Sequence, residues 1–268
     1  MKLSCTDVLV PGNSYTEKAQ ILRKLGFEGM AVYAAYETWT EQDEAELLQL
    51  RERTGIPVVE FAFVGPKFGH LMDVDPKKSA ETFQMYCDSV RVAGKLGALT
   101  ELECDIRRTE PLPFEHFAYP VLPQKSMVRF VSFVQALCDL GRESNTRVLI
   151  EAVNRYEALY VNRQMQALAL TKQVDRPNTG LLCDLFHMGL DEENICEVLR
   201  SCAASVQHVH LADSNRLLPG KGTLPWREIM DTLNEIKFTG YMNLECAVQG
   251  NAVQELQEVS QFLKRMIQ

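Results

Sequence analysis

Short apolar segments alternate with amphipathic segments along the whole chain, and this alternation is the feature that most limits its fold. Eight segments resemble buried strands, because they are short, apolar or β-branched, and bounded by polar residues or glycine. They are residues 2–5, 29–34, 57–64, 98–104, 147–153, 180–186, 206–212 and 241–246. A helical pattern follows each one, at residues 16–25, 41–54, 76–95, 125–143, 163–173, 192–202, 225–236 and 253–266. Eight strand–helix units are the number that closes a (β/α)8 TIM barrel.

The length favours one such barrel. A chain of 268 residues is close to the roughly 250 residues that this fold needs. An open doubly wound sheet would carry a glycine-rich turn after its first strand, and Cys5-Thr6-Asp7-Val8 has none. Glycines after expected helices, at Gly26, Gly55, Gly97 and Gly240, suit left-handed helix ends. With no linker or low-complexity tract, the sequence predicts a single α/β domain over residues 1–268. An irregular proline-rich loop at 105–124 either covers the catalytic face or is a simple surface excursion.

The composition limits the classes of function. A net charge of −8 weighs against nucleic acid or an anionic membrane as the main partner, because either needs a basic surface. No apolar run approaches the roughly 18 residues of a membrane span. The eight cysteines include no CxxC pair, which is typical of reduced thiols rather than a disulfide framework. An acidic residue follows Met1 too soon for a secretory signal peptide. We therefore expect a cytoplasmic protein that acts on a small molecule.

Residues that can bind a metal stand at the ends of the last four expected strands. Glu151 belongs to the fifth strand, Asp184 to the sixth, His210 to the seventh and Glu245 to the eighth. Taken singly, each carboxylate is better explained by a salt bridge. Active sites of these barrels lie at the carboxyl ends of the strands, so four such side chains favour one shared site. Buried carboxylates are costly unless they are paired or bind a cation. The sequence therefore predicts a metal site.

The ligand set also indicates the metal and the chemistry. Three carboxylates and one imidazole are mostly hard ligands, which favour one Mn²⁺ per chain, with Co²⁺, Mg²⁺ or Zn²⁺ as alternatives. Such an ion could polarise the carbonyl of a hydroxy-ketone and stabilise the enediolate that forms when the adjacent carbon loses its proton. Glu151 and Glu245 could remove that proton and return it on the other face, which inverts the carbon. Return to the neighbouring carbon would instead give aldose–ketose isomerisation.

Four segments of the second half resemble a known family. They are Ile150-Glu151-Ala152-Val153-Asn154-Arg155-Tyr156-Glu157, Cys183-Asp184-Leu185-Phe186-His187-Met188, His208-Val209-His210-Leu211-Ala212-Asp213-Ser214-Asn215-Arg216 and Leu244-Glu245. From about residue 147 to residue 245 the chain resembles the ketose 3-epimerases, which include D-tagatose and D-allulose 3-epimerases, in the xylose-isomerase-like barrel superfamily. The resemblance implies a divalent metal held by Glu151, Asp184, His210 and Glu245, with the two glutamates as the acid–base pair. It implies a substrate held by Glu157, His187 and Arg216.

The residues themselves leave these substrate roles open. Glu157 lies in a loop where a glutamate is usually only solvated. His187 comes just after a strand, where it could orient a substrate oxygen or cap a backbone group. Arg216 has a planar set of donors that suits hydroxyls and carboxylates, although an arginine at a rim often has no role. His208 shares a strand face with His210, and we expect it to lie behind the metal rather than bind it.

The resemblance is weak over the first 145 residues, which match the family only in layout. Cys5-Thr6-Asp7 occupies the place where we expect aromatic residues against a sugar, and the fourth strand carries Glu101 and Glu103. The loops of this half shape the far end of the pocket. The sequence therefore leaves the sugar open: a free ketose, a ketose phosphate or an oxidised glycoside.

We therefore predict a metal-dependent sugar epimerase, an enzyme of the isomerase class, that acts on a ketose or keto-sugar. Rivals that share its chemistry are an isomerase of the hydroxypyruvate type and a keto-sugar lyase. An abasic-site endonuclease would need more metal ligands and a basic groove, and the chain has five histidines and a charge of −8. A metal or sugar sensor would not need both glutamates. The resemblance also suggests a homo-oligomer.

Overall fold

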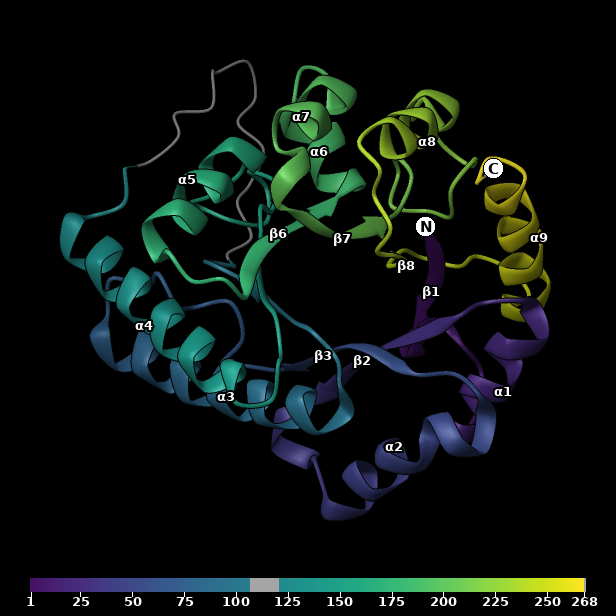
Figure 1. The fold of residues 1–268 in the computed structure, drawn as a ribbon, viewed down its shortest axis with the longest axis horizontal. Helices are drawn as coiled ribbons and strands as arrows, with labels where there is room; N and C mark the ends of the chain where they lie inside the picture. The colour runs from purple at the N-terminus through teal and green to yellow at the C-terminus, as the bar shows by residue number, and fades with distance from the viewer. Residues whose placement is uncertain (107–120, 268) are drawn as a thin grey trace.

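The computed structural model describes residues 1–106 and 121–267, which form a ring of parallel strands with helices around it (Figure 1). The strands are β1 (Lys2–Thr6), β2 (Gly29–Ala35), β3 (Val58–Val64), β4 (Thr100–Glu103), β5 (Val148–Glu151), β6 (Thr179–Asp184), β7 (Val206–Leu211) and β8 (Tyr241–Leu244). They pair in the order β3-β2-β1-β8-β7-β6-β5-β4. Backbone hydrogen bonds from Phe61 N to Leu99 O (2.9 Å) and from Leu99 N to Val59 O (3.1 Å) join β3 to β4. The predicted (β/α)8 TIM barrel is confirmed.

The helices follow the strands in the expected order. They are α1 (Tyr15–Leu25), α2 (Glu41–Thr54), α3 (Pro76–Leu96), α4 (Gln124–Arg142), α5 (Gln164–Val174), α6 (Leu185–Asp191), α7 (Ile195–Ser201), α8 (Trp226–Glu235) and α9 (Ala252–Lys264). The last helix lies beside the first, where Ser260 Oγ donates to Leu25 O at 2.9 Å. Within residues 1–106 and 121–267, no helix is both long and apolar enough to cross a membrane.

Some expectations about local structure are wrong. The sixth strand ends at Asp184 rather than at residue 186, and a short helix that was not expected, α6, follows it; the helix expected at 192–202 is present as the shorter α7. The Asp184 side chain caps α6 by accepting from His187 N at 2.8 Å, so the helix begins directly after the strand. Gly240 does not end a helix, because α8 already ends at Glu235. Most of the proline-rich loop expected at 105–124 lies outside the described residues.

The other glycine expectations hold. Gly26, Gly55 and Gly97 follow α1, α2 and α3 with φ of 82°, 79° and 69°. This left-handed conformation carries a penalty for residues with a Cβ atom and none for glycine. Each of these helices can therefore stop sharply and turn back towards the next strand.

The interior of the barrel differs from its outer layer. On β5, Val148 and Ile150 belong to the main apolar core between strands and helices, whereas Leu149 belongs to a small separate cluster with Leu99 and Leu182. Successive residues of a strand face opposite sides, so this small cluster lies inside the ring. The other fully buried residues at inward positions include Ser4, Thr6, Glu60, Glu151, Asp184, His208, His210 and Asn243. Most of the interior is therefore polar, and its polar atoms need partners.

Asp213 organises the loop between β7 and α8. Its carboxylate is fully buried and accepts hydrogen bonds from Ser214 N (2.8 Å), Gly220 N (2.8 Å), Leu224 N (3.0 Å) and Trp226 Nε1 (2.7 Å). Burial by itself raises the pKa of Asp213, but these donors outweigh it and hold the pKa below its ordinary value. One side chain therefore fixes a loop that also carries Arg216.

Replacing this carboxylate should destabilise the protein. In Asp213→Asn, an NH₂ group replaces one carboxylate oxygen and faces N–H donors, so two donors point at each other. We therefore expect the free energy of unfolding at pH 7 to fall by about 2 kcal/mol. The ionised carboxylate stabilises the fold only above its folded pKa, so the gap between wild type and variant should shrink as the pH falls below about 4. Urea titration at several pH values measures both. Asp231→Asn, on an exposed position of α8, should leave stability unchanged, and equal stability of the two variants would contradict the assigned role.

Candidate active site

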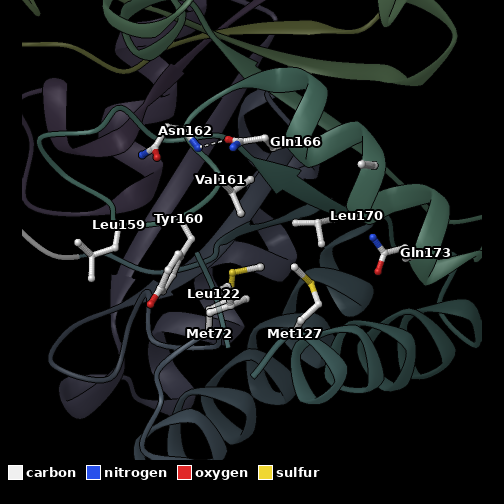
Figure 2. A pocket seen from close by; sticks show the side chains of 11 residues that line it. Met72, Leu122, Met127, Leu159, Tyr160, Val161, Asn162, Gln166, Leu170 and Gln173 are labelled. Carbon is white, nitrogen blue, oxygen red and sulfur yellow. Dashed lines mark hydrogen bonds between the residues drawn. The ribbon is translucent and has the colours of Figure 1, made fainter. Parts of the chain in front are cut away.

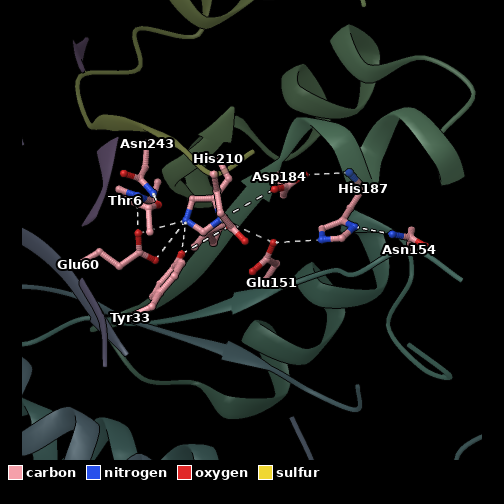
Figure 3. Close-up of polar contacts among 12 residues, drawn as sticks. Thr6, Tyr33, Glu60, Glu151, Asn154, Asp184, His187, His210 and Asn243 are labelled. Atoms are coloured by element: carbon pink, nitrogen blue, oxygen red, sulfur yellow. Dashed lines mark hydrogen bonds and ion pairs between the residues drawn. The ribbon is translucent and has the colours of Figure 1, made fainter. Parts of the chain in front are cut away.

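Four side chains meet at the carboxyl ends of β5 to β8. Figure 3 shows three of them, Glu151, Asp184 and His210. His210 Nδ1 lies 2.5 Å from Glu245 Oε2, 3.8 Å from Glu151 Oε1 and 3.9 Å from Asp184 Oδ2. One ligand atom from each of the four residues lies within 4.8 Å of the others. Glu151, Asp184 and His210 are buried, and the Glu245 side chain keeps 22% of its surface exposed. The structure thus brings together the residues that the sequence singled out, with one side open to a ligand.

Glu60 of β3 fixes the opposite edge of the His210 ring. His210 Nε2 lies 3.2 Å and 3.1 Å from the two Glu60 oxygens. A carboxylate accepts only, so the ring nitrogen that faces Glu60 carries a proton. A metal would therefore have to bind His210 through Nδ1, in place of any proton that Nδ1 shares with Glu245. Glu60 also lies 3.1 Å from Nε2 of His208, which is buried behind His210 as expected. A carboxylate on the second nitrogen is the usual support of a metal-binding histidine.

Burial and neighbouring charges shift the protonation of this cluster. Burial raises the pKa of Glu151, and the nearby Glu101 carboxylate raises it further. Burial also raises the pKa of Glu245, but His210 and Arg216 outweigh it and bring the pKa below its ordinary value. For His210, burial lowers the pKa, while Glu60 and Glu245 raise it well above its usual range. The surroundings therefore favour the charged forms of Glu245 and His210 and the neutral form of Glu151.

The donor atoms of the cluster fit a divalent cation. Glu151 Oε2 and Asp184 Oδ2 are buried without a hydrogen-bond partner among the described residues. Buried polar atoms normally have partners, so these atoms indicate a missing ligand. Three carboxylates and an imidazole form a mostly oxygen donor set of the kind that Mn²⁺ and Mg²⁺ take.

The three residues expected to hold the substrate lie beside the cluster. Asn154 contacts two of them, Glu157 and His187, and His187 contacts the third, Arg216. Asn154 Nδ2 lies 2.9 Å from Glu157 Oε1 and 2.7 Å from His187 Nδ1. Arg216 lies 3.1 Å from His187 Nε2 through Nη1, and it donates to Glu245 Oε1 at 3.1 Å through Nη2. Glu157, His187 and Arg216 therefore form one polar wall that runs from the cluster into the β5–α5 loop.

Arg216 reaches this wall from an unusual backbone conformation. Its φ is 62°, a left-handed value that costs a non-glycine residue about 1–2 kcal/mol. Arg216 N donates to Asp213 O at 2.8 Å, and Arg216 O accepts from Ala247 N at 2.7 Å. Its guanidinium stacks over the Phe186 ring at 4.6 Å. The loop thus holds a strained residue with its donors aimed at the cluster, which is typical of a functional position.

Sequence reasoning missed three residues of the site. Glu60 stands in the middle of an apolar strand, and Tyr33, from β2, places its hydroxyl 3.4 Å from His210 Nε2 and 3.5 Å from Glu245 Oε2. Both residues face inward, but strand alternation does not say which side chains reach across a barrel. Asn154 belongs to a segment that resembles the family, and its place between Glu151 and Glu157 was the available signal.

A separate apolar cavity of about 240 Å³ lies between α4 and α5 (Figure 2). Met127 of α4, Leu170 of α5 and Met72 line it, together with Tyr160 and Val161. None of the described residues around it belongs to the carboxylate cluster, and none of them is a carboxylate or a histidine. These are the groups that move protons to and from carbon most readily, so the candidate site is the polar mouth of the barrel.

Comparison with known proteins shows the family. The model of the family described as "Xylose isomerase-like TIM barrel" matches residues 19–266. The chain belongs to this family. The match spans nearly the whole barrel. It therefore includes the second half, which carries the carboxylate cluster, and most of the first 145 residues, where the sequence resembles the ketose 3-epimerases only in layout.

Individual relatives narrow the enzyme class. D-psicose 3-epimerase from Agrobacterium fabrum is 28% identical over 233 residues, which cover 86% of this chain and 78% of the relative. D-psicose 3-epimerase from Enterocloster bolteae is 31% identical over 131 residues, 48% of this chain and 44% of the relative. The structure of 3-keto-D-glucoside 4-epimerase from E. coli superposes with a TM-score of 0.85, at 19% identity and 99% coverage of both chains. The last similarity shows the fold alone.

Two predictions are confirmed by these findings. The resemblance to the ketose 3-epimerases holds, since curated relatives carry that name. The prediction of an isomerase-class enzyme holds as well, because these relatives are epimerases.

The two oxygens of Asp184 should be separable by mutation. Oδ1 caps α6 and Oδ2 faces His210. In the presence of a chelator, Asp184→Asn keeps the capping oxygen and Asp184→Ala loses it, while both lose the charge. We therefore expect the Asn variant to be more stable than the Ala variant by about 1 kcal/mol, measured by urea unfolding. Equal stabilities would show that the cap does not position this residue.

Proposed function

We propose that this chain is a metal-dependent epimerase that inverts a carbon next to the carbonyl group of a ketose or keto-sugar. The observation that carries the proposal is the cluster at the ends of β5 to β8, in which two glutamates flank one imidazole nitrogen and a carboxylate. The names of the relatives agree with this chemistry. One inverts carbon 4 of a 3-keto-glucoside, next to its carbonyl, and D-psicose is a 2-ketose inverted at carbon 3.

In this proposal the metal is held by Glu151, Asp184, His210 and Glu245. A bound divalent ion, with Mn²⁺ as the first choice, supplies a Lewis acid that favours loss of a proton beside the carbonyl. Glu60 favours a proton on His210 Nε2, which makes Nδ1 the nitrogen available to the metal. The cap that Asp184 makes to α6 leaves its second oxygen free for the same centre.

Glu151 and Glu245 are the proposed acid–base pair. Glu151 ends β5 and Glu245 directly follows β8, and their oxygens lie 3.8 Å and 2.5 Å from His210 Nδ1. A sugar carbon between them would lose its proton to one carboxylate as an enediolate forms. Protonation by the other carboxylate, on the opposite face, would invert the carbon.

The polar wall beside the cluster orients the sugar. Arg216 offers several N–H donors to hydroxyl oxygens, and His187 and Glu157 are held against each other by Asn154. A substrate hydroxyl can replace one of these contacts without leaving a partner unsatisfied. The eight free cysteines, seven of them buried, are typical of a reducing compartment, and we propose a cytoplasmic setting.

Isotope exchange tests the reaction type. Incubation with Mn²⁺ and a panel of ketoses and 3-keto-glycosides in D₂O should place deuterium on the inverted carbon beside the carbonyl, as read by NMR. Deuterium on the neighbouring carbon with conversion to an aldose would instead identify an aldose–ketose isomerase, and loss of a substituent would identify a lyase.

Replacing either glutamate should stop turnover. We expect Glu151→Gln and Glu245→Gln to lower kcat by at least about 100-fold, because the amide cannot exchange the proton. Metal content must be measured in parallel, since both residues are also proposed ligands. Glu52→Gln, at an exposed position, serves as the control. Near-native turnover in either glutamate variant would remove the acid–base assignment.

Glu60→Gln tests the support of His210. The variant loses the negative charge beside His210 Nε2, and one of the two oxygens that face this nitrogen becomes an NH₂ donor. We therefore expect Mn²⁺ affinity to fall about 10- to 100-fold, as measured by calorimetry. Activity should return towards the wild-type value at saturating Mn²⁺, because Glu60 does not contact the substrate. An unchanged metal affinity, or a loss of activity that metal does not restore, would contradict this role.

A further inference from the structure

A second group of carboxylates adjoins the cluster, on the side of β4. Glu101 and Glu103 are separated by Leu102, which is fully buried in the main core, so the two glutamates face the barrel interior. Glu103 pairs in register with Glu151 of the neighbouring strand. Like charges directly opposite each other destabilise a sheet, and here they do so where little water reaches them. The arrangement therefore needs a compensating partner.

Two other acidic residues of the interior, Glu60 and Glu245, already have such partners. Glu60 contacts His208 and His210, and Glu245 contacts His210 and Arg216. By contrast, among residues 1–106 and 121–267, no hydrogen-bond donor reaches Glu101 Oε2 or Glu151 Oε2. Glu101 is 2% exposed and Glu151 is 1% exposed. A buried carboxylate without a donor is costly.

The geometry suits a cation between these three residues. One oxygen of each of Glu101, Glu103 and Glu151 lies within 4.8 Å of the other two, so small side-chain movements would bring all three onto a cation placed among them. The group of ligand atoms around His210 does not include Glu101 or Glu103, so a cation bound there would leave these two carboxylates outside its ligand set.

We propose that Glu101, Glu103 and Glu151 hold a second divalent cation, with Glu151 shared between this cation and the one at His210. This inference rests on the proposed function, because it assumes an occupied first site. Three carboxylates and no nitrogen ligand suit a hard ion such as Mn²⁺ or Mg²⁺. Cations that share a carboxylate usually lie about 3.5–4 Å apart. Such spacing would allow the second ion to face another oxygen of a bound sugar.

The number of bound ions tests this inference in the full chain. The protein is stripped with a chelator, loaded with Mn²⁺ and exchanged into metal-free buffer, and metal is counted by mass spectrometry. We expect two Mn²⁺ per wild-type chain, and a spin-coupled electron paramagnetic resonance spectrum rather than that of an isolated ion. Glu101→Gln/Glu103→Gln should retain one Mn²⁺ with the spectrum of an isolated ion. Glu52→Gln should match the wild type.

The outcomes separate the two proposals. One Mn²⁺ per wild-type chain that survives Glu101→Gln/Glu103→Gln and is lost in Asp184→Asn would overturn the second site and leave the proposed function standing. No bound Mn²⁺ in the wild type would overturn both. Urea unfolding in chelator checks that each variant folds, and the single variants Glu101→Gln and Glu103→Gln replace the double variant if it does not. Each is expected to weaken binding of the second Mn²⁺ at least tenfold.

Discussion

The contact between Glu60 and His210 is the interaction on which the geometry of the site depends. A divalent cation could bind His210 Nδ1 only if the remaining ring proton were on Nε2, and Glu60 is the group that favours a proton there. Because Glu60 comes from β3 and His210 from β7, the contact crosses the barrel. The positions of these two strands in the barrel therefore influence which ring nitrogen of His210 carries a proton.

Most of the fold was accessible from the sequence because its signals are local. Strand segments are marked by short apolar runs, and Gly26, Gly55 and Gly97 mark helix ends that only glycine adopts easily. The error at α6 has an equally physical origin. Asp184 ends a strand, caps a helix and faces the cluster at once. A pattern of apolar residues does not reveal that one side chain starts a new helix.

The site was only partly accessible, for the same reason. Glu151, Asp184, His210 and Glu245 were found because each stands near the end of a strand, and the fold places strand ends together. Glu60 and Tyr33 act across the barrel on a residue more than a hundred positions away. Such contacts follow from the radius of the ring and the tilt of its strands, which the sequence does not display. The left-handed backbone of Arg216 was hidden too, since nothing in its neighbours requires it.

The two halves of the barrel have different parts in this arrangement. The strands β5 to β8 supply the side chains that meet at His210 Nδ1, whereas β2, β3 and β4 supply Tyr33, Glu60 and the pair Glu101 and Glu103. The first half therefore decides how much negative charge surrounds the centre and how it is balanced. The carboxylates of β4 face the barrel interior rather than the apolar layer between strands and helices. Exchanging them would therefore change the charge around the centre with little effect on that layer.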